Sequence, residues 1–78
     1  MARYFFHIMN DIDVVDEEGQ ELPSLAAARH QALAYARDLA SQSVKEGAVN
    51  LNHRIVVEDE DHEQLLAVTF REAFTITY

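Results

Sequence analysis

Acidic side chains are the densest source of potential chemistry in this sequence. Most of the 14 Asp and Glu residues lie in two short clusters, in residues 11–21 and 58–63. Carboxylate oxygens are the ligands that Ca²⁺ and Mg²⁺ prefer in proteins, so the second cluster is a candidate divalent-cation site. It lacks the glycine and the length of an EF-hand loop, and solvated turns that keep an acidic protein soluble explain the same residues. The candidate ligands are Asp59, Asp61, His62 and Glu63.

The two clusters would act together if the chain between them forms a β-α-β crossover. In that topology the end of the first strand, the start of the helix and the tip of the hairpin share one end of the molecule. The dipole at the helix N-terminus tolerates negative charge. The expected functions of such an end are binding of a divalent cation or of a basic partner.

His7 is the histidine with the greatest potential for chemistry, because it lies in the middle of an aromatic strand. Catalysis by a histidine requires a second group within reach, such as a nucleophile or an orienting carboxylate. The sequence nominates no such group. We therefore expect a packed or interface histidine.

Arg29 is the one charge that helical periodicity places within an apolar stripe. A charge there is costly unless it is paired, and an acidic loop lies just before the helix. We predict a structural salt bridge that ties this loop to the helix, and the alternative is an anion site. The carboxylates expected to pair with Arg29 are those of Asp16, Glu17, Glu18 and Glu21.

The elements that must position these groups are one long helix and several strands. Pro23 marks the start of the helix and Gly47 its end, and alanines and leucines form a wide stripe between them. In the hairpin that follows, alternation turns Ile55 and Val57 toward the helix. The predicted elements are a strand at about 3–9, an acidic loop at 10–22, the helix at about 23–46, a hairpin at about 54–70, and a last strand or arm at 73–78.

The sequence also resembles a known family. The segments that carry the resemblance are Arg-Tyr-Phe-Phe-His at residues 3–7, Asp-Glu-Glu-Gly-Gln-Glu-Leu-Pro at 16–23 and Leu-Ala-Ala-Ala-Arg at 25–29. They are similar to a family of small bacterial proteins catalogued as a domain of unknown function. The chain departs from that pattern at its strand-like tail and at Asp61-His62, where such proteins often have Asp-Gly. The resemblance implies a fold and no activity.

Composition limits the possible functions. The formal net charge is −8 and the six basic residues are scattered singly, so binding of nucleic acid is not expected. The chain has no cysteine and no apolar stretch near the ~20 residues that span a membrane. A short strand-like run, and not a secretory segment, follows Met1. We expect a single cytoplasmic domain that needs no cofactor.

The fold class expected is α+β, with the helix on one face of a mixed or antiparallel sheet of three to four strands. The other face is apolar, and a twofold homodimer would cover it. The function expected first is a non-catalytic interaction module that associates with itself. Its expected partners are a second copy of the chain and another protein. The alternatives are a DNA-linked regulator of the small antitoxin type and a cation-binding protein. The predicted interface residues are Phe5, His7, Val56, Leu65, Phe74, Ile76 and Tyr78.

Overall fold

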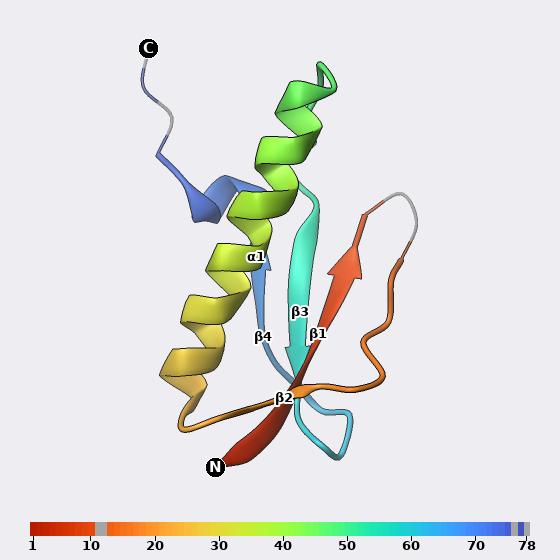
Figure 1. Ribbon diagram of the computed structural model, residues 1–78, viewed down its shortest axis with the longest axis vertical. Helices are drawn as coiled ribbons and strands as arrows, with labels where there is room; N and C mark the ends of the chain where they lie inside the picture. The colour runs from red at the N-terminus through yellow and green to blue at the C-terminus, as the bar shows by residue number, and fades with distance from the viewer. Residues whose placement is uncertain (11–12, 76, 78) are drawn as a thin grey trace.

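A helix packed on one face of a four-stranded antiparallel sheet forms the protein, in a computed structural model that describes residues 1–10, 13–75 and 77 (Figure 1). This is the α+β class that the sequence predicts. In chain order the elements are β1 (Ala2–Met9), β2 (Gln20–Leu22), α1 (Leu25–Lys45), β3 (Arg54–Glu58), β4 (Gln64–Thr69) and the short 3₁₀ helix η1 (Phe70–Ala73).

The strand order is β2-β1-β3-β4, and every pair of neighbours is antiparallel. The β-α-β crossover considered for the sequence does not form, because it requires parallel strands, and the antiparallel alternative is confirmed. The start of α1 and the turn between β3 and β4 lie at the end of the molecule where β1 begins (Figure 1). The acidic segment before α1 runs back along β1, so that Glu21 lies opposite Arg3, and Glu17 lines the same hollow as Glu58 and His62. The two acidic clusters therefore approach one another, although on an antiparallel sheet.

The observed helix, Leu25–Lys45, begins two residues later than predicted and ends close to the predicted residue. Ser24 is the N-cap, and its hydroxyl oxygen accepts a hydrogen bond from the Ala27 N–H. The helix therefore starts at Leu25, and Pro23 lies outside it. Gly47 has a φ of 104° just past the last turn, the left-handed conformation that glycine adopts most easily.

The core lies between α1 and the sheet. The helix contributes a stripe of small residues, and the sheet contributes large apolar side chains on the alternate positions predicted from the sequence. Burying each large side chain contributes roughly 1.5–3 kcal/mol. Because the stripe is almost entirely alanine, the helix backbone lies close to the sheet. The fully buried members, including two from η1, are Ala28, Ala32, Ala36, Ile55, Val57, Val68, Phe70 and Ala73.

After β4 the chain turns, and the described residues show no further strand. The Thr69 hydroxyl accepts from the Glu72 N–H, and the Glu72 carboxylate accepts from Thr69, which forms a capping box that starts η1. The guanidinium of Arg37 donates to the Ala73 carbonyl and fixes η1 to the helix. Two members of the predicted last strand, Ile76 and Tyr78, lie outside the described residues.

Within the described part of the chain, no helix has both the length and the apolar character needed to cross a membrane.

Candidate functional site

The most elaborate polar arrangement surrounds His7 on the sheet face that α1 does not cover. We call this surface the open face. The His7 side chain is only 7% exposed, and its Nε2 lies 2.8 Å from Oε1 of Glu58. Its Nδ1 lies 3.0 Å from the backbone nitrogen of Asp16. The residues of the open face are Phe5, His7, Met9, Arg54, Val56, Glu58, Leu65, Ala67 and Thr69.

These contacts determine the hydrogen positions on the His7 ring. A backbone N–H can only donate, so Nδ1 must be the acceptor, and Nε2 carries the hydrogen that it donates to Glu58. Both ring nitrogens are therefore engaged by the protein itself. A general base needs a free nitrogen lone pair facing a substrate, and His7 presents none in this arrangement.

Asp16 completes this cluster and organises the loop before β2. Its Oδ2 accepts from the Phe6 N–H at 3.1 Å, and its Oδ1 accepts from the N–H groups of Glu18 and Gly19 at 3.1 Å each. Burial by itself would raise the pKa of Asp16, but these three N–H donors outweigh it and hold the pKa below its usual value. The carboxylate thus takes the place of a neighbouring strand along this part of β1.

Glycine is required at position 19 for two reasons. Its φ is 71°, and a Cβ there would lie 2.9 Å from Cγ of Arg3 and 2.9 Å from Cε1 of Phe5. The loop backbone therefore lies directly against β1. The Arg3 guanidinium donates to the Glu18 carbonyl oxygen at 2.7 Å and lies 3.5 Å from the Glu21 carboxylate, which holds the loop from outside.

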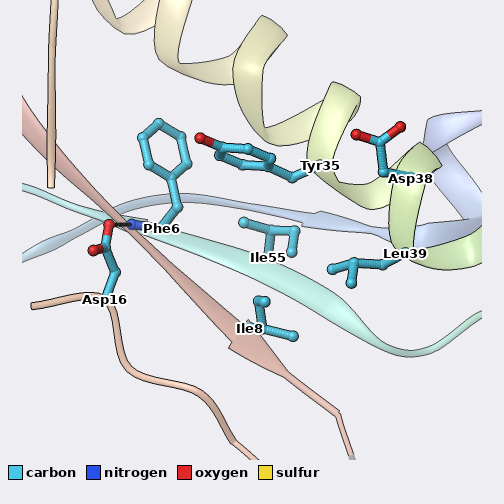
Figure 2. Close-up of a pocket in the computed structure, with 7 residues that line it drawn as sticks. All are labelled: Phe6, Ile8, Asp16, Tyr35, Asp38, Leu39 and Ile55. Atoms are coloured by element: carbon cyan, nitrogen blue, oxygen red, sulfur yellow. Dashed lines mark hydrogen bonds between the residues drawn. The ribbon is translucent and has the colours of Figure 1, made fainter. Parts of the chain in front are cut away.

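Two hollows flank this loop, and Asp16 borders both. The first, of about 340 Å³, lies between α1 and the sheet; Figure 2 shows Tyr35 and Leu39 reaching into it from the helix above Ile55. The Tyr35 ring meets Phe6 edge-on at 5.4 Å, and its hydroxyl donates to Gln20. The second hollow, of about 370 Å³, lies on the open face and is lined in part by Met9.

The hollow on the open face has an apolar floor and an acidic rim. Phe5 and Val15 contribute apolar surface, and Glu17 and Glu58 contribute carboxylates. Val15 is 63% exposed, although it is a large apolar residue. This hollow suits an apolar side chain better than a polar substrate.

The predicted cation ligands in the turn at 59–63 have other roles. Oδ1 of Asp59 accepts from the N–H groups of Asp61 and Glu63, so that carboxylate stabilises the turn. His62 has a φ of 63° and its ring lies against Phe5, with the centroids 6.2 Å apart. Among the described residues, no three His, Asp or Glu side chains form an arrangement that could hold a metal ion.

The salt bridge expected for Arg29 is absent from the described part of the structure, where Arg29 is exposed. The acidic loop is instead held by Arg3, which pairs with Glu21 from the first strand. The helical wheel was misleading because the buried stripe of α1 is narrower than predicted: it runs through Ala28 and Ala32, and Arg29 lies beside it. Leu25, on the same predicted stripe, is also exposed.

The predicted interface residues do not form one surface. His7 and Val56 lie on the open face but are already buried within the chain, and Leu65 on the same face is 38% exposed. Phe74 lies elsewhere, in an apolar groove beside Val44 on the helix. Phe5 belongs to the open face and is half-buried.

Several residues of the site were not identified from the sequence. Glu58 was assigned to a strand and to the second acidic cluster, although it is the partner of His7. Asp16 was considered as a member of the first acidic cluster and as a partner for Arg29. A local signal existed for Asp16, because Asp followed three residues later by Gly is typical of a turn capped by the Asp side chain. No local signal links Glu58 to His7, because 51 positions separate them.

Comparison with protein families gives one match. Residues 3–71 match the model of the family described as Domain of unknown function (DUF6894). Comparisons with curated proteins and with solved structures give no significant match. The match covers most of the chain, so the protein belongs to the DUF6894 family. This confirms the resemblance to a domain family of unknown function that the sequence indicated.

Proposed function

We propose that this DUF6894 domain is a non-catalytic interaction module that associates with a second copy of itself. The observation that carries the proposal is the uneven cover of the sheet: α1 packs on one face, whereas on the other no described helix or strand packs and only the loop around Asp16 lies against His7 (Figure 1). An uncovered apolar sheet surface is typical of an interaction site.

The side chains on the uncovered side support this proposal. Phe5 and Met9 are only half-buried, and Leu65 and the neighbouring Val15 are more exposed. Covering two or three such side chains contributes roughly 1.5–3 kcal/mol each. That is a large share of the stability of a domain of this size.

The polar groups support a non-catalytic role. The His7 ring is engaged at both nitrogens, and the Tyr35 hydroxyl donates to Gln20. In the described part of the chain, no nucleophile lies next to an available base. The DNA-linked and cation-binding alternatives receive no specific support from these contacts.

Sedimentation equilibrium across the micromolar range tests the proposal. We expect the average mass to rise to twice that of the chain, with a reversible dependence on concentration. A mass equal to one chain at every concentration would contradict self-association. High salt is a useful second condition, because it screens repulsion between chains of net charge −8 and should strengthen the dimer.

A further inference from the structure

The outer edge of β4 is the one long edge of the sheet without a neighbouring strand in the described structure. β4 is the last strand in the order β2-β1-β3-β4. The Phe70 N–H donates to the His53 carbonyl, which shows that residues 66, 68 and 70 face β3. Because the pattern alternates, the backbone N–H and C=O groups of Ala67 and Thr69 face outward, and the alternation ends at Leu65, where the register shifts.

The sequence of β4 lacks the charges and the proline that often protect an edge, and the one interruption of the strand is a register shift at Leu65. Proteins block free edges with Lys, Pro, inward-pointing charges or β-bulges. β4 reads Gln-Leu-Leu-Ala-Val-Thr, with no charge and no proline. The nearest charges flank it, at Glu63 and Arg71.

We propose that two copies of the chain associate by antiparallel pairing of β4 with β4, about a twofold axis that places Ala67 opposite Ala67 of the second copy. This inference rests on the proposed self-association and specifies its geometry. In this register Ala67 exchanges both of its backbone hydrogen bonds with Ala67 of the second copy, and the Thr69 carbonyl lies toward Leu65 of the second copy. The Thr69 N–H already donates to Glu72 of its own chain. The two sheets become one sheet of eight strands, and the twofold axis closes the assembly.

The register is complementary in side chains as well as in backbone groups. Leu66 lies opposite Val68 of the second copy; Val68 is fully buried in its own core, so at this position only the partly buried Leu66 offers apolar surface. Glu63 comes next to η1 of the second copy, which carries Arg71, and both side chains are exposed. Glu72 in the same turn is occupied, since it caps Thr69 of its own chain.

Charge favours this edge over the open face as the contact. Pairing two open faces would bring Glu17 and Glu58 of each copy toward the same groups of the other. Antiparallel β4 strands instead place the two acidic turns, residues 59–63, at opposite ends of the pair. The dimer then forms without adding repulsion at its centre.

Substitutions at Ala67 test the edge, because its N–H does not contribute to the pairing with β3. Ala67→Pro removes an outward N–H, a position where proline is tolerated in an edge strand. Ala67→Lys places two like charges together at the axis, although it reduces the net negative charge of each chain. Both variants should remain folded and weaken dimerisation at least about tenfold. The matched control is Ala48→Lys, at an exposed loop position, which should leave the dimer unchanged.

A second measurement determines directly which residues of the two β4 strands lie opposite each other. In a mixture of isotope-labelled and unlabelled chains, the Hα atoms of Leu66 and Val68 should show a contact between copies, because they form a non-hydrogen-bonded pair with Cα atoms about 4.5 Å apart. Absence of this contact in a dimer would overturn the inference.

The outcomes separate the two proposals. A wild-type monomer at every concentration would contradict the proposed function, and the edge pairing with it. A wild-type dimer that Ala67→Lys and Ala67→Pro leave intact, but that Phe5→Glu dissociates, would overturn only the edge pairing. Loss of the dimer in both Ala67 variants, with folded circular dichroism spectra, would support the edge.

Discussion

The two sides of the sheet end in different ways. On the side of β1, the strand is completed by β2, by a backbone bridge between Ile8 and Val14, and by the Asp16 carboxylate. On the side of β4, the last strand has no described neighbour. A short strand and one carboxylate thus close one edge. The difference shows that a side chain can take the place of a neighbouring strand where a loop of the same chain runs back along β1. The edge of β4 has no such loop in the described structure and remains available to a second chain.

The largest effect is expected from removing Asp16. Asp16→Ala leaves the N–H groups of Phe6, Glu18 and Gly19 without their acceptor, so the free energy of unfolding should fall by about 2–4 kcal/mol. Urea denaturation measures it. The control is Asp13→Ala in the same loop, at an exposed position, with an expected change within about 0.5 kcal/mol. Equal effects of the two variants would show that Asp16 does not close the edge.

A somewhat smaller effect is expected at Gly19. Gly19→Ala places a Cβ within 2.9 Å of Arg3 and Phe5 in a left-handed conformation, and should cost about 2–3 kcal/mol. Gly47→Ala is the matched control, because its φ is also positive but no atom lies within 4 Å of the added Cβ. It should cost about 1 kcal/mol. Similar losses would mean that conformation alone, and not the close approach to β1, requires glycine at position 19.

The pH dependence of stability distinguishes the charge of Asp16 from its shape. Burial opposes the three N–H donors, but in the folded protein these donors hold the pKa of Asp16 below its ordinary value. The carboxylate therefore contributes stability above that value, and the contribution is lost as the pH falls through the folded pKa. Asp16→Asn should be less stable than the wild type at neutral pH, and the difference should shrink in the acid range. A difference that stays constant with pH would contradict this.

The smallest effect on the folded chain is expected at the free edge. Ala67→Lys should change the free energy of unfolding of the monomer by no more than about 0.5 kcal/mol, because its main-chain groups pair with nothing inside the chain. Thermal denaturation at protein concentrations too low for the dimer to form checks this. A loss as large as that of Asp16→Ala would show that the edge of β4 is already engaged within the monomer.

The long-range pattern of this fold could be predicted from the sequence. The alanine stripe and the period-two alternation of residues 54–58 and 64–69 are repeated signals, and both identified the core face correctly. The central position of β1 was also predictable, since both of its faces are largely apolar. These features depend on many residues that agree with one another.

The closed edge could not be predicted in the same way. β2 has only three residues and lies within an acidic segment, so no alternation marks it. The pairing of His7 with Asp16 and Glu58 depends on the strand register, which sequence spacing does not fix. The turn after β4 did have a local signal, Thr69 followed by Glu72, and that capping box explains why the expected last strand does not continue β4.

The alanine stripe of α1 also affects how uniquely the helix is placed along its axis. Ala28, Ala32, Ala36 and Ala40 recur every four residues, so a slide of about 6 Å along the axis brings each alanine to the place of the next. The stripe by itself therefore allows more than one registry. Larger, unrepeated contacts select the observed one: Tyr35 against Phe6 and Gln20, and Arg37 on the Ala73 carbonyl. A chain without Tyr35 and Arg37 would keep its helix and its sheet while sampling shifted registries, which exchange broadening of its alanine methyl signals would reveal.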